Sequence, residues 1–219
     1  MKEFTGHESA YRGEEVVENR QSTKILICGV GALGSWLVDI LARQGFSDMT
    51  VLDMDKVEVK NFGTQNYSQT DVGRPKALQT STNLFKRLKV KTSPVNKKLT
   101  ENNVSMLKGF DLIVDAFDNS ESRMLISDYV NNNGLNCVHI GMGNGFGDVT
   151  WDNGSYKVGK TNEAVDENGE PCEYPLASNL VHATVLMASE SICRFVDEGS
   201  RQNMRFALRS MSMESFESN

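Results

Sequence analysis

Cysteine is scarce in this chain, whose 219 residues contain only four, and no two of the four form a CxxC pair. Such scattered positions exclude the disulfide framework of a small secreted protein and argue against a zinc knot. Residues 1–21 are polar and acidic and hold no apolar signal region. We therefore expect a reduced, cytoplasmic environment, in which buried thiols behave as small hydrophobic residues.

Basic residues are also in the minority. Lys and Arg total 23 against 29 Asp and Glu, which gives a formal net charge of -6. No basic stripe is available to displace counterions from a phosphate backbone, so we expect no nucleic-acid partner. A continuous apolar span is missing too, because Asn179, His182 and Glu190 interrupt the long apolar stretch over residues 177–196. This stretch predicts a buried or dimer-forming helix and no membrane association.

The best-defined motif spans residues 24–55. An apolar run leads into the letters GVGALG, a helical pattern follows, and a second apolar run ends at Asp53. Strand, glycine turn, helix and strand in this order predict the first unit of a nucleotide-binding sheet. Gly29 would permit the tight turn, Gly31 would let backbone approach a phosphate, and Gly34 would let the helix pack close to the strand. The unpaired N–H groups at the helix start favour an anion, and Asp53 can accept hydrogen bonds from ribose hydroxyls.

Predicted strands and helices alternate along most of the chain. This alternation predicts an α/β fold that is Rossmann-like, with a mainly parallel sheet, helices on both faces and an antiparallel C-terminal extension. We expect a single domain with an N-terminal arm (1–22), a nucleotide-binding core (23–141) and a third part (142–219). The third part would contain a hairpin of Phe146–Trp151 with residues 155–158, a crossover loop, the long helix and a final strand.

Four more motifs follow the glycine turn. They are Asp53-Met54-Asp55, Asn61-Phe62-Gly63-Thr64-Gln65, Gly73-Arg74-Pro75-Lys76 and Asp118-Asn119, the last with Arg123 one helical turn on. In this order and spacing they make the chain, from about residue 24 to about residue 196, resemble the ThiF/MoeB/HesA branch of the ubiquitin-activating enzyme superfamily. Members of this branch adenylate the C-terminal glycine of a ubiquitin-like protein with Mg-ATP. The resemblance implies a homodimeric adenylation domain that acts on a ubiquitin-like or sulfur-carrier protein or peptide.

The resemblance also implies roles for individual residues. Asp53 would hold the ribose, Lys76 would offer a positive charge to phosphate oxygens, and Asp118 would bind Mg²⁺. Asn61 and Gln65 would position the triphosphate of ATP as neutral hydrogen-bonding groups. The expected nucleotide site consists of Gly29, Gly31, Gly34, Asp53, Asp55, Asn61, Gln65, Lys76 and Asn119. The expected catalytic residues are Lys76, Asp118 and Cys172.

Other interpretations of these residues stay open. Asp118 would cap the helix that follows it, Lys76 would be solvated, and Asn61 and Gln65 would satisfy the backbone of their loop. An NAD-dependent oxidoreductase would share the glycine turn, which also occurs in NAD and FAD sites, but would leave Lys76 and Asp118 unexplained. A non-catalytic nucleotide-binding scaffold for a second subunit is the third possibility, and Thr64 favours it.

Thr64 is the main departure from the family pattern. It stands where the family usually has an arginine before the glutamine, so a cation that contacts phosphate is missing. Arg12, Arg20 and Arg74 are the candidates to replace this arginine. We expect Arg12 or Arg20, in the N-terminal arm, to be the counterpart of a family arginine that reaches across the dimer to the triphosphate.

Cys172 is the one cysteine that we predict in a polar loop. A thiolate is a suitable nucleophile for an acyl adenylate, and some family members carry a nucleophilic cysteine in the corresponding crossover loop. Glu170 and Glu173 flank Cys172 and would raise its pKa, which disfavours the thiolate. An incidental free thiol is therefore an equal alternative to a catalytic one.

Overall fold

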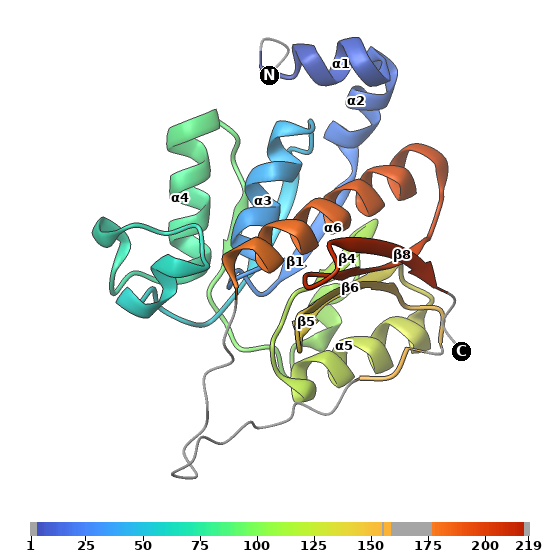
Figure 1. Ribbon diagram of the computed structural model, residues 1–219. Helices are drawn as coiled ribbons and strands as arrows, with labels where there is room; N and C mark the ends of the chain where they lie inside the picture. The colour runs from blue at the N-terminus through green and yellow to red at the C-terminus, as the bar shows by residue number, and fades with distance from the viewer. Residues whose placement is uncertain (1–3, 155, 159–176, 217–219) are drawn as a thin grey trace.

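The computed structural model describes residues 4–154, 156–158 and 177–216. They form one eight-stranded sheet with helices packed around it (Figure 1). The strands lie in the order β3-β2-β1-β4-β5-β6-β7-β8. Pairing is parallel from β3 to β5 and antiparallel from β5 to β8. The predicted fold class, including the antiparallel C-terminal extension, is confirmed. The strands are β1 (Lys24–Cys28), β2 (Asp48–Leu52), β3 (Ser93–Val95), β4 (Leu112–Asp115), β5 (Cys137–Gly143), β6 (Phe146–Trp151), β7 (Asn203–Ala207) and β8 (Ser212–Phe216).

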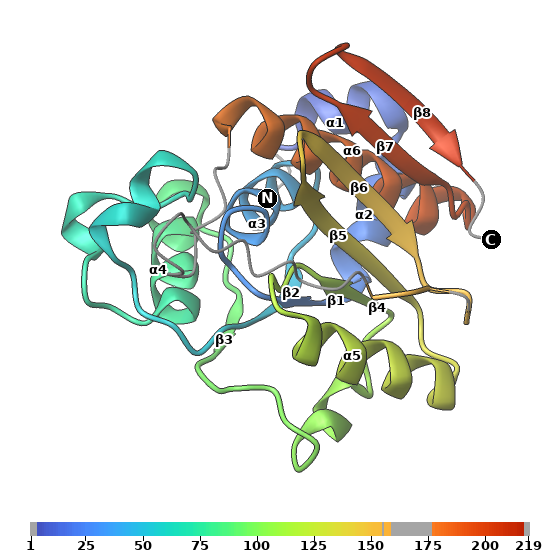
Figure 2. The ribbon, with the colours of Figure 1, turned by 60° about the horizontal axis from the view of Figure 1, so that its bottom comes forward.

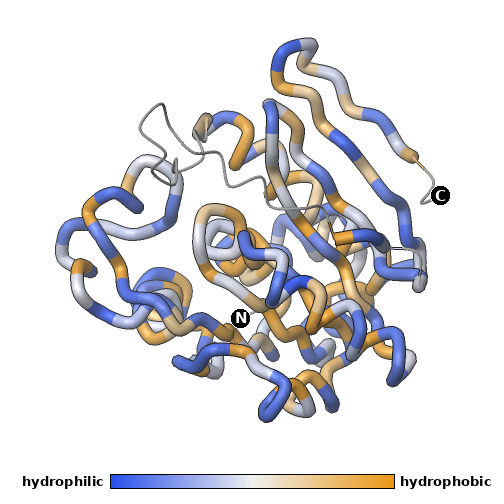
Figure 3. Tube along the Cα trace, turned by 90° about the horizontal axis from the view of Figure 1, so that it is seen from below, coloured by the Kyte–Doolittle hydropathy of each residue, from blue (hydrophilic) through white to orange (hydrophobic). Residues whose placement is uncertain are grey.

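Helices cover both faces of the sheet. On one face, α3 (Gly34–Arg43), α4 (Lys76–Leu88) and α6 (Ser178–Glu198) enclose the larger apolar core. On the other, α5 (Ser120–Asn133) and the short helix η3 (Val104–Leu107) enclose a smaller one (Figure 1). Central parallel strands buried on both faces need apolar side chains in every position, which explains the unbroken apolar runs in β1 and β4. Hydrophobic stretches accordingly follow the strands and helices, and hydrophilic stretches occupy many of the outer turns (Figure 3).

The long helix α6 packs on the sheet, as expected for a buried helix. Val181, Val185 and Ala188 are fully buried on its inner side, at the spacing that places residues on one helix face. No helix among the described residues combines the length and the apolar character that crossing a bilayer requires.

The N-terminal arm forms two helices, α1 (Gly6–Arg12) and α2 (Glu14–Ser22), which pack beside α6 (Figure 1). Arg20 fixes this arm. Its side chain is fully buried and donates to Asp197 at 2.9 Å and to Glu8 at 3.0 Å. The expectation that Arg20 reaches across a dimer is therefore wrong, because this guanidinium is enclosed within its own chain and is neutralised by carboxylates there.

The predicted hairpin of β6 with residues 155–158 is also wrong. β6 pairs with β5, and the turn between them is Asn144-Gly145, with φ values of 53° and 81°. Two left-handed residues form the turn that suits a two-residue hairpin, so this Asn-Gly pair was the stronger signal. Residues 156–158 form no strand. The predicted final strand is β7, and a further strand, β8, pairs with it at the open edge of the sheet (Figure 2).

Candidate nucleotide-binding and metal site

Three glycines shape the turn between β1 and α3. A Cβ atom on Gly34 would lie 1.9 Å from the Gly29 carbonyl oxygen, and one on Gly29 would lie 2.9 Å from the Ala116 carbonyl oxygen. Gly29 also has a φ of 89°, which side chains disfavour. A Cβ atom on Gly31 would meet no heavy atom within 4 Å. Packing within the chain therefore requires Gly29 and Gly34, whereas the space beside Gly31 is open to a ligand.

This turn lies beside the ends of two neighbouring strands. The Gly29 N–H donates to the Leu52 carbonyl at 2.8 Å, and the Ala116 N–H donates to the Cys28 carbonyl at 2.8 Å. The residues that follow β2, β1 and β4 are thus side by side at one edge of the sheet. The helices after β1 and β4 lie on opposite faces of the sheet (Figure 1). Open parallel sheets bind their ligands at such a switch point.

The start of α3 follows this turn directly. Leu33, at the N-cap, makes no side-chain capping bond. The first N–H groups of a helix have no partner within the helix, and they carry the positive end of its dipole. An anion beside Gly31 would therefore be stabilised by backbone groups alone.

Asp53 connects the glycine turn to the end of β2. Its carboxylate accepts the Val30 N–H at 2.9 Å and the Asp55 N–H at 2.8 Å. Burial raises the pKa of Asp53, although these two backbone bonds favour its charged form. Each carboxylate oxygen keeps a second lone pair. The predicted bond from a ribose hydroxyl thus has an acceptor in the right place, and the ribose role remains a prediction.

Lys76 is the first residue of α4. Its side chain is 9% exposed and its ammonium lies 3.2 Å from the carboxylate of Asp55, which is 55% exposed. The solvated alternative for Lys76 is wrong, since the side chain is buried. A buried ammonium with one half-exposed partner has donors to spare for phosphate oxygens.

Asn61 and Gln65 differ in whether their side-chain oxygens already have a hydrogen-bond partner among the described residues. The Asn61 side-chain oxygen accepts the Glu58 N–H at 2.8 Å and completes a capping box at the start of η1 (Val59–Gly63). The Gln65 side-chain oxygen is buried and has no hydrogen-bond partner among the described residues. Such a group calls for a partner, and an amide that flips can offer either its oxygen or its NH₂. Gln65 is therefore suited to contact a nucleotide, whereas Asn61 already has a structural role.

Asp118 and Asn119 follow the buried end of β4. Asn119 caps α5 by accepting the Ser122 N–H at 2.9 Å, so the capping role belongs to Asn119 and not to Asp118. Asp118 is exposed at the same edge as the glycine turn. An exposed carboxylate beside a phosphate-binding helix start is a suitable ligand for Mg²⁺, which keeps several waters and takes few protein ligands.

A buried cluster of charged residues next to this edge was not predicted. His139 of β5 has Nδ1 2.7 Å from Asp115 and Nε2 3.0 Å from Asp152. The ring of Tyr156 stacks on the imidazole with centroids 3.6 Å apart, and its hydroxyl accepts from Arg123 at 3.1 Å. Burial alone would lower the pKa of His139, but the two carboxylates more than offset burial and the pKa is raised. The cluster therefore places one arginine and one histidine beside two carboxylates.

The comparison with protein families decides the assignment. The model of the ThiF family matches residues 8–217. The chain belongs to the ThiF family. The predicted resemblance is thereby confirmed, and the matched region extends beyond the residues that carried it, into the N-terminal arm and the last strands.

Three curated relatives of this ThiF-family chain are 28–35% identical to it in sequence over the matched regions. A sulfur carrier protein adenylyltransferase from Thermus thermophilus is 35% identical over 120 residues, 53% of this chain and 44% of the relative. A NEDD8-activating enzyme E1 catalytic subunit from Schizosaccharomyces pombe is 32% identical over 116 residues, 52% of this chain and 26% of the relative. A tRNA threonylcarbamoyladenosine dehydratase from Haemophilus influenzae is 28% identical over 154 residues, 67% of this chain and 58% of the relative. The matched regions thus span between 26% and 58% of these relatives.

Solved structures show the same fold. Escherichia coli MccB in complex with MccA-N7isoASN superposes with a TM-score of 0.82 at 16% identity, over 97% of this chain and 70% of that one. MccB with ATP superposes with a TM-score of 0.80 at 17% identity, over 97% of this chain and 69% of that one. At these identities the likeness supports the fold of the ThiF-family chain.

The missing family arginine has no evident replacement at the glycine turn. Thr64 uses its carbonyl oxygen to accept the Trp36 indole N–H at 2.9 Å. Arg20 is buried in the arm, and Arg12 donates to Glu190 at 2.7 Å. Arg12 is 24% exposed and Arg74 is exposed, so these two remain the candidates for a phosphate contact.

The cysteines among the described residues are not suited to act as nucleophiles. Cys28, Cys137 and Cys193 are buried free thiols. Burial raises the pKa of each, to about 12 for Cys193. A thiol with a raised pKa is a poor nucleophile at neutral pH. Cys172 lies outside the described residues, and its predicted role stays a prediction.

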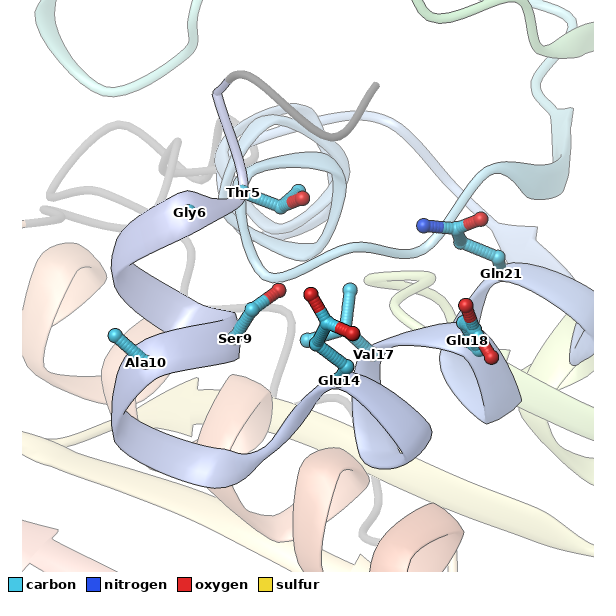
Figure 4. Close-up of a pocket in the computed structure, with 8 residues that line it drawn as sticks. All are labelled: Thr5, Gly6, Ser9, Ala10, Glu14, Val17, Glu18 and Gln21. Atoms are coloured by element: carbon cyan, nitrogen blue, oxygen red, sulfur yellow. The ribbon is translucent and has the colours of Figure 1, made fainter.

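A shallow hollow lies between α1 and α2 (Figure 4). None of the predicted nucleotide-binding residues lines it. It contains the carboxylates of Glu14 and Glu18 and no basic side chain, so it is unsuited to a triphosphate. Its lining residues are Thr5, Gly6, Ser9, Ala10, Glu14, Val17, Glu18 and Gln21.

Proposed function

We propose that this chain binds Mg-ATP at the glycine turn and adenylates the C-terminal carboxylate of a ubiquitin-like or sulfur-carrier protein or peptide. One observation carries the proposal: Asp53, the open space at Gly31 and the exposed Asp118 meet at the ends of three neighbouring strands. Relatives named as a sulfur carrier protein adenylyltransferase and as an E1 subunit support the reaction class. The MccB structure with ATP supports the nucleotide.

The reaction requires the protein mainly to position the reactants and to neutralise the phosphate charge. A carboxylate oxygen of the substrate attacks the α-phosphorus of ATP, a new P–O bond forms, and the bond to the departing pyrophosphate breaks. The Mg²⁺ ion, when bound, neutralises phosphate charge, and Asp118 would hold it. Lys76 supplies a second positive charge, and the N–H groups at the start of α3 bind phosphate oxygens. Asp53 orients the ribose.

The charge of the chain favours a protein or peptide substrate over tRNA. A relative from Haemophilus influenzae is named for a tRNA modification, but this chain has a formal net charge of -6. Binding of a nucleic acid depends largely on basic residues that release counterions. An oxidoreductase also fits less well, because the buried Lys76 and the exposed Asp118 have no role in binding NAD.

We further propose that the chain acts as one cytoplasmic adenylation domain and forms a two-fold homodimer. The N-terminal arm and α6 form one surface, on which Leu186 of α6 is 65% exposed. Two-fold dimers are the commonest closed assembly, and such a dimer would let Arg12 approach the partner's nucleotide. Light scattering at micromolar concentration tests the proposal, and a monomer would contradict it.

The metal role of Asp118 is tested by the variant Asp118→Ala. The substrate is first captured by incubating the chain with Mg-ATP and identifying the trapped proteins by mass spectrometry. With that substrate, Asp118→Ala should abolish ATP–pyrophosphate exchange while the melting temperature stays near that of the wild type. Asp128→Ala removes an exposed carboxylate from α5 and serves as the control. Unchanged exchange in Asp118→Ala would refute the assignment.

We also propose that Cys172 receives the activated carboxyl as a thioester. Its thiolate would attack the acyl carbon of the adenylate, and AMP would leave. The test incubates the chain with ATP and the carrier protein and looks for a conjugate of the two proteins that an added thiol cleaves. Cys172→Ala should form none, and the buried Cys193 provides the control variant Cys193→Ala. An identical conjugate in Cys172→Ala would place the role elsewhere.

A further inference from the structure

Charged side chains hold both backbone groups of Phe117, the residue before Asp118. The Phe117 N–H donates to the carboxylate of Asp115 at 3.1 Å. The Phe117 carbonyl accepts from Arg123 Nε at 2.6 Å. Hydrogen bonds to ionised groups are roughly twice as strong as neutral ones. The peptide that leads into Asp118 is therefore fixed from both sides, while Asp118 itself stays exposed.

Arg123 extends this connection to the neighbouring strand. Its Nη2 donates to the Ile140 carbonyl of β5, and its Nη1 donates to the Tyr156 hydroxyl at 3.1 Å. The guanidinium thus uses three of its nitrogens on three partners, and its planar fork sets the angles between them. It also lies 3.8 Å from the carboxylate of Asp115, which compensates its charge.

The cluster behind Arg123 makes the arrangement rigid. Asp115 is shared between Phe117 and His139, whose imidazole is held on its other side by Asp152. Asp152 in turn accepts the Ser127 hydroxyl of α5 at 2.7 Å. A fully satisfied buried polar network has one low-energy geometry. Asp115 and Arg123, the two groups that hold Phe117, both belong to this network.

We propose that Arg123, oriented by Tyr156 and Asp115, is a positioning residue that sets the place of Asp118 for binding Mg²⁺ with ATP. The inference rests on the proposed function. A metal ligand has to be held within a fraction of an ångström of its productive position by groups that are themselves fixed. Arg123 meets this requirement because it binds the carbonyl directly before Asp118 and is fixed by three other partners, Ile140, Tyr156 and Asp115.

The test measures how strongly the metal and the nucleotide assist each other. The dissociation constant of ATP is determined by calorimetry in Mg²⁺ and in EDTA. We call the value in EDTA divided by the value in Mg²⁺ the coupling. Asp118→Asn should bring this coupling close to one. Arg123→Lys should reduce it about tenfold, because it removes charge-assisted bonds. Tyr156→Phe should reduce it about threefold, since a hydrogen bond to a charged group is lost while the ring stack stays.

Two comparisons separate positioning from general damage. Tyr129→Phe removes a phenolic oxygen from α5, where the ring lies against Lys108, and should leave the coupling at the wild-type value. In EDTA, where no metal is bound, Arg123→Lys should bind ATP as tightly as wild type does. The inference is overturned if Tyr156→Phe and Arg123→Lys keep the wild-type coupling, or if the loss of ATP affinity in Arg123→Lys also appears in EDTA. A wild-type chain that binds no ATP would overturn the proposed function as well.

Discussion

The two halves of the candidate site are built by opposite means. The glycine turn after β1 leaves space, because side chains are missing at Gly29, Gly31 and Gly34 and no heavy atom lies within 4 Å of a Cβ atom built on Gly31. The segment that follows β4, called the exit below, instead gathers charged side chains. Asp115 and its charged partners lie behind the exposed Asp118. The first arrangement leaves room for a ligand, and the second fixes one exposed carboxylate. A substitution at the open position of the turn, Gly31, should therefore affect binding, and a substitution in the charged cluster behind Asp118 should affect stability.

The largest effect is expected at the exit. Asp115→Asn would leave Arg123 without its carboxylate partner and His139 with Asp152 alone in a buried site. Removing one member of a buried ion pair typically destabilises a protein by about 3–5 kcal/mol. Urea unfolding of this variant should show a loss in that range, or no folded protein at all. A loss below about 1 kcal/mol would show that the cluster is not a stabilising unit.

The turn itself provides a matched pair of substitutions. Gly34→Ala places a Cβ atom 1.9 Å from a backbone oxygen, and we expect a loss of about 3 kcal/mol from this overpacking. Gly31→Ala meets no neighbour within 4 Å and should change the free energy of unfolding by less than about 1 kcal/mol. The same Gly31→Ala variant should lose ATP affinity. Equal stability losses in the two variants would contradict the assigned roles of these glycines.

A pH dependence above neutral pH should come from His139. The pKa of His139 is raised, so its contribution is complete below about pH 6.5 and is lost as the pH rises through the raised value. The melting temperature should therefore fall as the pH rises above about 6.5, and this fall should be absent in His139→Gln. The charged or titratable groups that face His139 are Asp115, Asp152, Arg123, Tyr156 and Cys137. An identical pH profile in the variant would contradict the ion-paired imidazolium.

The smallest effect is expected at the arm. Arg12 pairs with Glu190 at 2.7 Å, and the two side chains are 24% and 30% exposed. A partly exposed ion pair contributes less than about 1 kcal/mol, so Arg12→Ala should shift the urea midpoint only slightly. A loss as large as that of Asp115→Asn would remove the distinction between peripheral and buried ion pairs in this chain.

The glycine half of the site was predictable because its evidence is local. Gly29, Gly31, Gly34 and Asp53 occur within one strand–helix–strand unit, and each has a spacing that the backbone geometry requires. The alternation of strands and helices likewise predicted the parallel sheet and its antiparallel extension. The same motifs, in their order, identified the family before any comparison.

The buried cluster was not predictable because its partners are far apart in the sequence. His139 meets Asp115 only through the register of β4 and β5, and it meets Asp152 only because β6 pairs with β5. The sequence interpretation gave β6 a different partner, since Asp152-Asn153-Gly154 looked like a hairpin turn. In the structure Asp152 instead accepts the Gly154 N–H at 3.0 Å and binds His139. A single wrong strand pairing thus concealed the cluster that supports Asp118.

Nucleotide-dependent thermal stability tests the central claim most directly. A ligand at about one hundred times its dissociation constant stabilises the folded state by about 2.7 kcal/mol, which should raise the melting temperature of a chain of this size by about 5–10 °C. We predict this rise for wild type with Mg-ATP, no rise with NADH, and no rise for Gly31→Ala with Mg-ATP. A rise with NADH in place of Mg-ATP, or an undiminished rise for Gly31→Ala, would contradict the account.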